Sequence, residues 1–449
     1  MRAALLALVA ACTPEVVPPD LVDTDDPDAH DALSRPAEPT LSTAGLSGAL
    51  ACSGCHPDHY AAWRTSMHAY AMHDPVFRAL QRARVADHEG RQAQFCTQCH
   101  TPLGSRDGDV LAHPDLEGLG PLSVEGVTCE VCHTVASVAR TSQAGLVLDV
   151  DGPMRGTLPD PEPTAAHATT HSPLHGTAEL CAACHDVREV GGLPLERPYA
   201  EWRSSPAGRE GRPCQSCHMP ETRGPAAVGG PERVVHRHGW IGGGMPLLPG
   251  FLDDTERAAR LAEVTALLQG AAALDVDAPM HWTPGGVLPV VVTVRNLVDG
   301  HAFPTGTTFN RQVWVEVTVT DEADAVLYRS GDLDEDGNLR DVWSRLDPFG
   351  DADLVTLSST LSDGHGDPVL FPWVATEHTG RALPPALERT FTWLVPVPSA
   401  PVGRLHARVR LLYRQYGPHL LEALDVEAGP DALPVLEVAT GEIEVFPPP

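Results

Sequence analysis

The pattern of hydrophobic and polar positions changes beyond the middle of the chain. In its C-terminal part, runs of β-branched and other apolar residues are separated by turns that contain Gly, Pro and Asp. These runs predict β-strands at 290–294, 313–319, 390–395 and 405–412. Strands and turns in this order predict a β-sandwich of immunoglobulin-like architecture.

Two other stretches have the pattern of helices. Residues 57–72 contain no internal helix breaker. A second helix begins at Asp253 and Asp254, which suit a helix N-terminus, and ends near Gly270. Its apolar stripe is Leu261, Val264, Leu267 and Leu268. We therefore predict a mixed α + β fold, in which a region of helices and loops precedes the β-sandwich domain.

One pentapeptide frame, C-x-x-C-H, occurs five times, at 52–56, 96–100, 129–133, 181–185 and 214–218. This frame is the attachment site of c-type haem. Its two thiols bind the vinyl groups of one haem, and its His becomes the proximal ligand of the iron. The predicted anchors are Cys52, Cys55, Cys96, Cys99, Cys129, Cys132, Cys181, Cys184, Cys214 and Cys217. The predicted proximal ligands are His56, His100, His133, His185 and His218, which makes five covalently attached haem c groups.

Two other uses of these cysteines are a disulfide framework and zinc knuckles. Neither explains why a His follows the second Cys of every motif. Aromatic residues make up only 5% of the chain, a shortage that five buried haems would answer as large apolar core elements. The intervals between motifs are too short for five separate domains, so we expect the haems to pack against one another.

The chain is strongly acidic, with a net charge of −29. It contains Arg but no Lys. An acidic surface disfavours nucleic acid and anionic membranes as partners and favours a cationic protein or small molecule. The absence of Lys also excludes a Lys-ligated catalytic haem.

The N-terminus has the pattern of an export signal. Residues 1–11 contain one charge followed by a short apolar run, too short to span a bilayer. The run ends in a sequence that resembles a bacterial lipobox, which implies lipidation of Cys12, although an ordinary secretory signal with a stray Cys is the alternative. Residues 12–48 are rich in Pro and Asp and predict a flexible tether. We expect a lipid-anchored protein of the bacterial cell envelope, facing the periplasm or the surface.

The segment after the first motif contains Trp63, Ser66 and His68 in a W-x-x-S-x-H arrangement. With it the chain resembles the cytochrome c-554 family of multihaem cytochromes. The resemblance continues at 74–77, 99–104, 125–127, 199–202 with Ser204, and 217–220. The family's namesake has four haems and this chain has five motifs, so ligand pairs do not transfer one to one. The wider superfamily includes hydroxylamine-oxidising and nitrite-reducing enzymes, which leaves carrier and enzyme as open alternatives.

A second axial ligand decides whether an iron is closed for electron transfer or open to a substrate. The family resemblance implies His68 and His238 as distal ligands. We also expect His113, between the second and third motifs, and His171, before the fourth motif. The alternatives are His73, His236, His167 and His175, with Met67 or Met72 as a further candidate at one iron.

One stretch of the β-domain carries a candidate ligand. Residues 300–306 read G-H-A-F-P-T-G and are followed by Arg311 and Trp314. They resemble a G-H-x-F-P-T-G segment of β-domains that are appended to multihaem cytochromes. The resemblance implies that His301 caps a haem from outside the haem domain; the alternative is an ordinary loop histidine.

The sequence thus predicts a signal peptide at 1–11, a tether at 12–48, a pentahaem domain at 49–250, a connecting helix at 251–275 and the β-domain at 276–449. The leading function is electron transfer between redox partners such as cytochromes or quinol-linked enzymes, with no catalytic residue. One alternative is a haem enzyme with an open iron that oxidises or reduces a small nitrogen or sulfur compound. Another is an assembly subunit whose β-domain docks a partner.

Overall fold

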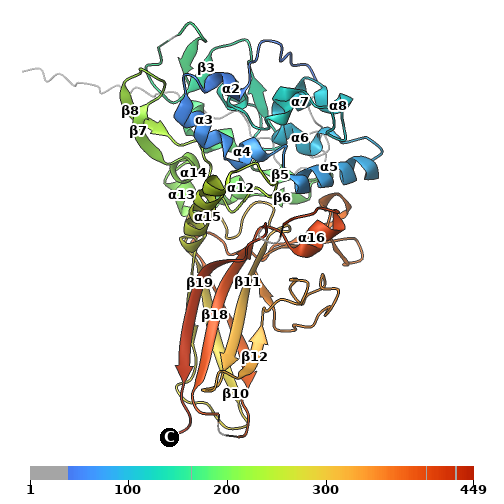
Figure 1. The fold of residues 1–449 in the computed structure, drawn as a ribbon, viewed down its shortest axis with the longest axis vertical. Coiled ribbons are helices and arrows are strands. Elements are labelled where there is room, and N and C mark those ends of the chain that lie inside the picture. Colours follow the sequence, from blue (N-terminus) through green and yellow to red (C-terminus); the bar gives the residue numbers. More distant parts are fainter. Residues whose placement is uncertain (1–38, 163, 401, 430–431) are drawn as a thin grey trace, which may run out of the picture.

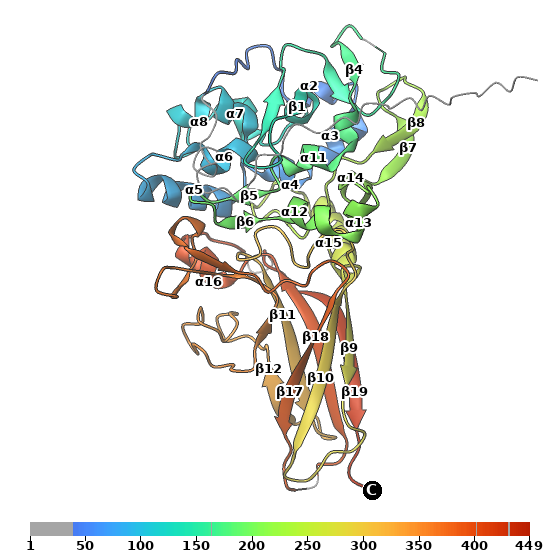
Figure 2. The same ribbon diagram turned by 180° about the vertical axis from the view of Figure 1, so that it is seen from behind.

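The computed structural model describes residues 39–162, 164–400, 402–429 and 432–449. Short helices and hairpins form one end of the molecule and long strands form the other (Figure 1). Figure 2 shows the same two parts from behind. The predicted mixed α + β fold is confirmed. The predicted signal peptide, Cys12 and the tether as far as residue 38 lie outside the described residues.

The region of the C-x-x-C-H motifs consists of short helices. They are α2 (Ala49–Cys52), α3 (Pro57–Arg64), α4 (Met67–Tyr70), α5 (Pro75–Asp87), α6 (Gln94–His100), α7 (Pro102–Arg106), α8 (Asp109–Ala112), α9 (Pro121–Val124), α10 (Cys129–His133), η1 (Pro173–Gly176), α11 (Ala178–Ala182), α12 (Pro198–Ser204), α13 (Pro206–Arg209) and α14 (Gln215–His218). The helix predicted over 57–72 is divided into α3 and α4. Ser66 has an extended backbone there, and its hydroxyl caps α4 by accepting a hydrogen bond from Ala69 N–H.

Small two-stranded sheets connect these helices. They pair β1 (Val135–Val138) with β2 (Leu146–Leu148), β3 (Met154–Gly156) with β4 (Thr169–His171), β5 (Val187–Arg188) with β6 (Pro194–Glu196), and β7 (Glu221–Pro225) with β8 (Glu232–His236). The pairing is parallel in β3–β4 and antiparallel in the others.

The last residues of the predicted tether are packed against this region. Leu41 N–H donates to the Arg106 carbonyl at 3.0 Å. The backbone N–H groups of Ser47 and Gly48 donate to the Glu130 carboxylate, each at 3.1 Å. Residues from Leu41 to Gly48 therefore pack against the motif region, whose start the sequence predicts at residue 49.

Helix α15 (Asp254–Gln269) links the two parts. Asp253 caps its N-terminus in a capping box with Glu256, as the Asp-rich start predicts. Val264 and Leu268 of the predicted stripe are buried, whereas Leu267 is 37% exposed. The helix ends at the predicted Gly270, which is its C-cap.

The β-domain contains two main antiparallel sheets. One has the order β17 (Glu388–Pro396), β10 (Val287–Asn296), β9 (Ala272–Asp277), and the other the order β12 (Val326–Ser330), β11 (Gln312–Thr320), β18 (Leu405–Arg414), β19 (Leu436–Val445), with β13 (Val355–Thr356) also paired to β11. The four predicted strands lie within β10, β11, β17 and β18 and are confirmed. Alternate residues of both sheets, such as Val292 and Val409, share one hydrophobic core. The immunoglobulin-like topology stays a prediction, and β9 begins within the predicted connecting segment.

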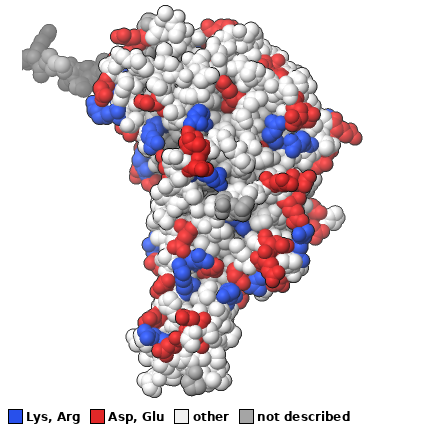
Figure 3. Space-filling view, viewed as in Figure 1, with Lys and Arg blue, Asp and Glu red and all other residues white. Residues whose placement is uncertain are grey.

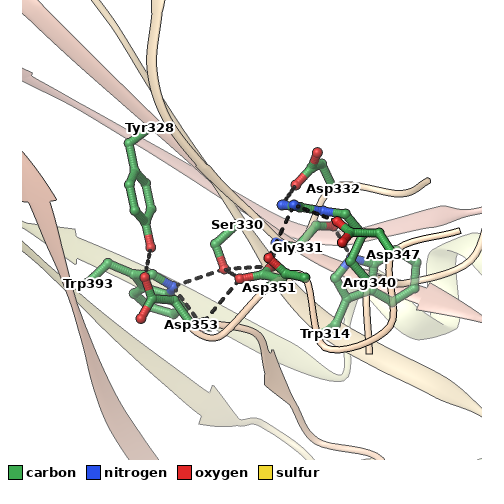
Figure 4. A network of polar contacts seen from close by, with 11 residues as sticks. Trp314, Tyr328, Ser330, Gly331, Asp332, Arg340, Asp347, Asp351, Asp353 and Trp393 are labelled. Carbon is green, nitrogen blue, oxygen red and sulfur yellow. Dashed lines mark hydrogen bonds and ion pairs between the residues drawn. The ribbon is translucent and has the colours of Figure 1, made fainter. Parts of the chain in front are cut away.

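Smaller elements complete the domain. They are β14 (Thr360–Ser362), β15 (Pro368–Val369), η2 (Pro372–Val374), β16 (Glu377–Thr379) and α16 (Pro418–Ala423). The long connection from β12 to β13 is held by polar contacts (Figure 4). Asp351 accepts hydrogen bonds from Ser330 Oγ and Gly331 N–H, and Arg340 pairs with Asp332 at 2.6 Å and Asp347 at 3.3 Å.

Side chains from both parts meet where the parts join. The Tyr416 hydroxyl donates to Asp74 Oδ2 at 3.2 Å, and Trp373 Nε1–H donates to Asp87 Oδ2 at 2.7 Å. Val76 of α5 packs with Leu420 and Leu421 of α16 in one apolar cluster. These contacts fix the β-domain against the motif region and so position any β-domain residue that reaches a haem.

The surface carries mixed charge. On the face in Figure 3, Asp and Glu side chains are interspersed with Arg over both parts of the molecule. Within the described residues, none of the helices has the length and apolar character needed to cross a bilayer.

Candidate haem sites

Each C-x-x-C-H motif forms a helical turn or the end of a helix. The His N–H donates to the carbonyl of the first Cys at 2.8 Å in the first motif, 2.9 Å in the fourth and 3.0 Å in the fifth. A helical turn brings the two Cys side chains and the His to the same neighbourhood. All ten motif cysteines are free of disulfides. The chain therefore presents unbonded thiol pairs beside a His, as thioether attachment of haem requires.

The structure places imidazole rings opposite the His of four motifs. The pairs are His56–His167 at 6.3 Å between ring centres, His133–His238 at 6.2 Å, His218–His301 at 6.2 Å and His68–His185 at 6.2 Å. Metal–imidazole bonds are about 2 Å long, so ring centres about 6 Å apart leave space for one ion between two nitrogens. The residues present thus fit bis-histidine ligation of haem iron.

Three of the pairs share a second feature, a hydrogen bond on Nδ1 of each ring. The rings of the motif histidines donate to carbonyl oxygens of Ala226 (2.7 Å, from His56), Arg155 (2.6 Å, from His133) and Ile241 (2.8 Å, from His218). The rings opposite them donate to those of Ala168 (3.2 Å, from His167), His236 (2.8 Å, from His238) and Ala302 (2.8 Å, from His301). Such bonds orient a ligand and leave Nε2 free for the metal. In these pairs the rings lie within 23° of parallel.

The His68–His185 pair is different. Its rings are tilted by 53°, and the buried Nδ1 of His68 has no hydrogen-bond partner. Burial, together with the smaller effect of the neighbouring His185, lowers the pKa of His68 to about 3. His68 is therefore neutral, the protonation state that a metal ligand needs.

The second motif also differs from the others. The ring of His100 is stacked on Phe77, with 3.9 Å between centres and 7° between planes. Among the described residues, no imidazole faces His100 at the spacing of the four pairs. Met72 packs with Phe77 and Cys96 in a small apolar cluster. The Nδ1–H of the predicted ligand His113 donates to Asp109 Oδ1 at 3.0 Å.

The structure distinguishes between several histidines that the sequence offers as alternative second ligands. His167, and not His171, lies opposite His56; His171 is exposed, with its Nδ1 3.2 Å from the Leu158 carbonyl. His175 is parallel to His133 at 5.9 Å, but its Nε2 lies 2.9 Å from the Cys132 carbonyl and is already bonded there. The rings of His73 and His236 are not paired with a motif His among the described residues.

Contacts between cysteines show which motifs are neighbours. The Cys52 thiol interacts with that of Cys129, so the first and third motifs adjoin. The thiol of Cys184 interacts with that of Cys99, and the thiol of Cys181 with that of Cys214. The fourth motif therefore adjoins both the second and the fifth. No local sequence signal indicates this order, because it arises from packing between distant segments.

The W-x-x-S-x-H segment holds His68 in place through residues near the third motif. Trp63 Nε1–H donates to the Val127 carbonyl at 2.8 Å, and Val127 N–H donates to the His68 carbonyl at 3.1 Å. Gly126 lies between these bonds with φ of +73°, and a Cβ there would be 2.6 Å from the His68 carbonyl oxygen. The family-like residues thus form one clamp around His68.

The segment of His301 is held by a residue that the sequence did not single out as functional. Glu201 Oε2 accepts hydrogen bonds from Ala302 N–H at 3.0 Å and Thr305 Oγ1 at 2.6 Å. Asn296 Nδ2 donates to the His301 carbonyl at 3.1 Å. The sequence signal that could have indicated the role of Glu201 is its position beside Trp202 in the family-like stretch.

Comparisons with known proteins agree with this geometry. Residues 51–134 match the family model described as cytochrome c554 and c-prime. Among solved structures, the chain is similar to a penta-heme cytochrome c552 from Thermochromatium tepidum, with a TM-score of 0.63 and 21% identity, covering 89% of this chain and 99% of that chain. No curated protein matches the chain in sequence.

At 21% identity the structural likeness shows a shared fold. The repeated motifs, the paired imidazoles and the family match together define a multihaem c-type cytochrome.

Proposed function

We propose that this chain is a pentahaem electron-transfer protein of the bacterial cell envelope, anchored through a lipid on Cys12. The observation that carries the proposal is the set of four opposed imidazole pairs. Two nitrogen ligands fill both axial positions of an iron, so such a site exchanges electrons and does not bind substrate. Bound haem supplies one-electron redox chemistry.

The packing of the motifs supports transfer along the chain. The first and third motifs adjoin, and the fourth adjoins the second and fifth. In this proposal His301, which faces His218, would be the second ligand at the fifth motif, and the β-domain would belong to the electron-transfer unit. The number of five haems rests on the five motifs, and the structural relative is a penta-heme cytochrome, which accords with it.

The proposed localisation and partners are supported by the site of haem attachment, the N-terminal sequence and the net charge. Haem c is attached outside the bacterial cytoplasm, and residues 1–12 have the pattern of an exported lipoprotein. A net charge of −29 favours a redox partner with a basic docking face, such as a cytochrome or a subunit of a quinol-linked enzyme.

Electron paramagnetic resonance on the purified ferric protein, calibrated against total haem, tests the proposal. We expect four low-spin irons from the four pairs. Two or more high-spin irons would contradict the proposal, and a mass below that of the chain with five haems would contradict the cofactor number.

The second motif favours a second candidate, a haem enzyme acting on a small nitrogen or sulfur compound. No imidazole faces His100 among the described residues, and the buried charged groups of Arg84 and Glu189 lie near Cys96. Burial raises the pKa of Glu196 to about 7, against the lowering influence of Arg311, so this carboxyl can exchange a proton near neutral pH. Arg311 Nη1–H donates to the Tyr413 hydroxyl at 3.3 Å.

The two candidates give opposite spectra at the second motif. An open iron gives one high-spin signal that shifts on adding nitrite, hydroxylamine or nitric oxide, and Arg311→Gln weakens that shift. A closed iron gives a fifth low-spin signal. If Met72→Ala then creates a high-spin signal while His113→Ala does not, Met72 is the ligand and the enzyme candidate fails.

A further inference from the structure

Arg260 is a buried cation close to one of the paired sites. It lies on α15 and is 3% exposed. Its Nη1–H donates to the Gly239 carbonyl at 3.0 Å, while its Nε and Nη2 have no hydrogen-bond partner. Burial lowers the pKa of Arg260, and the charge of Glu263 opposes that effect. Glu263 is itself within 3.3 Å of Arg237. The negative charge of Glu263 is therefore shared between Arg260 and Arg237.

Arg260 adjoins the His68–His185 pair through the segment of Gly239 and Trp240. Trp240, next to the carbonyl that Arg260 binds, contacts the His68 ring edge-on at 4.7 Å between centres. A fixed positive charge in a buried site favours the state with one more electron, because its field is weakly screened there.

The hydrogen bonding of the ligand rings at this site also favours the reduced state of the iron. In the other three pairs each ring donates Nδ1–H to a carbonyl, which makes the imidazole a more basic ligand and stabilises ferric iron. Nδ1 of His68 has no such acceptor. Weaker donor character favours ferrous iron.

We propose that His68, His185 and Arg260 give the site at the fourth motif the highest reduction potential of the four paired sites. The inference rests on the proposed binding of haem at that motif. In the transfer, one electron leaves a ferrous neighbour, which becomes ferric, and reduces ferric iron to ferrous at this site. Since the fourth motif adjoins the second and the fifth, these residues hold an electron at the junction of the array.

The ring geometry makes the site observable. Tilted imidazole planes give a low-spin ferric signal with a larger highest g value than nearly parallel planes, and only the His68–His185 pair is tilted by 53°. A potentiometric titration of the purified holoprotein with dithionite, followed by paramagnetic resonance, can therefore follow this site separately. We expect its signal to disappear before those of the three parallel pairs.

Substitution of Arg260 tests the electrostatic part. Arg260→Gln should shift the reduction equilibrium of this site about tenfold toward the oxidised form, or ~59 mV for one electron. Arg260→Lys should restore most of the shift because it keeps the charge. Arg257→Gln, one turn earlier on α15, is the control and should move the potential little.

Two results would overturn the inference: reduction of the tilted-pair signal together with or after the parallel pairs in the wild-type protein, or equal potentials in Arg260→Gln and wild type. The wild-type titration needs no variant to fold. Failure of the proposed function looks different, since it would show as a missing haem or a high-spin iron at the fourth motif.

Discussion

Two segments of the motif region share the sequence W-x-x-S and the same local structure. One runs from Trp63 to Ser66 and the other from Trp202 to Ser205. Each indole donates to a carbonyl, of Val127 at 2.8 Å and of Arg212 at 2.7 Å. Each Ser caps the next short helix. The two segments are therefore built alike up to the serine.

They differ two residues later, at His68 in the first and Ala207 in the second. His68 reaches the ring of His185, whereas Ala207 has no ligating group. Ala207 N–H instead donates to the Asp299 carbonyl at 3.1 Å, and the β-domain segment that follows brings His301 opposite His218. The comparison teaches that one type of clamp can present a ligand from its own chain segment or receive one from another domain.

The largest effect is expected from His301→Ala. Removing the ring that faces His218 should convert one iron to high spin without loss of covalent haem, because the cysteine anchors are unchanged. Paramagnetic resonance and the mass of the protein measure the two quantities. His365→Ala, at an 88% exposed side chain of the same domain, is the control. An unchanged low-spin spectrum would refute the role of His301.

His68→Ala is the matching change in the first segment. It should also convert one iron to high spin, but the tilted-pair signal should disappear instead of a parallel-pair signal. The junction with the β-domain should be unaffected, because His68 does not bridge the two parts. Loss of the same signal in both variants would break the comparison.

Glu201→Gln should sharpen the comparison, because it changes only the second segment, in which Glu201 holds the loop of His301. The carboxylate accepts bonds from Ala302 N–H and Thr305 Oγ1, and charge-assisted bonds contribute about 1.5–3 kcal/mol. We expect a loss of about 2 kcal/mol in the free energy of unfolding, measured by denaturant titration, and partial high-spin character at the fifth motif. Glu210→Gln, at a 64% exposed carboxylate, should cost less than ~0.5 kcal/mol.

The smallest effects are expected from the two helix caps. Ser66→Ala removes the acceptor for Ala69 N–H, and Ser205→Ala removes the acceptor for Gly208 N–H. Each should cost about 1 kcal/mol of unfolding free energy in the holoprotein. Similar losses would support the equivalence of the segments, while a neutral change at only one would show that they are not equivalent.

Much of the fold was predictable because its signals are local. The four strands follow from period-two alternation in runs such as 313–319, and the start of α15 follows from Asp253. The helix over 57–72 was predicted as one element and is two. Ser66 has no strong breaking tendency by itself, and its cap forms in the context of the Trp63 and Val127 contacts.

By itself the sequence determined the predicted haem anchors and proximal ligands, because C-x-x-C-H places its chemistry within one helical turn. Only the tertiary structure decided which imidazoles face the histidines of the motifs. The choice of His167 over His171 and the pairing of His301 with His218 depend on how distant segments pack. The buried charge of Arg260 and the neighbourhood of the fourth motif arise in the same way. A second axial ligand must meet its iron from across the haem, so chain folding, and not residue spacing, selects it.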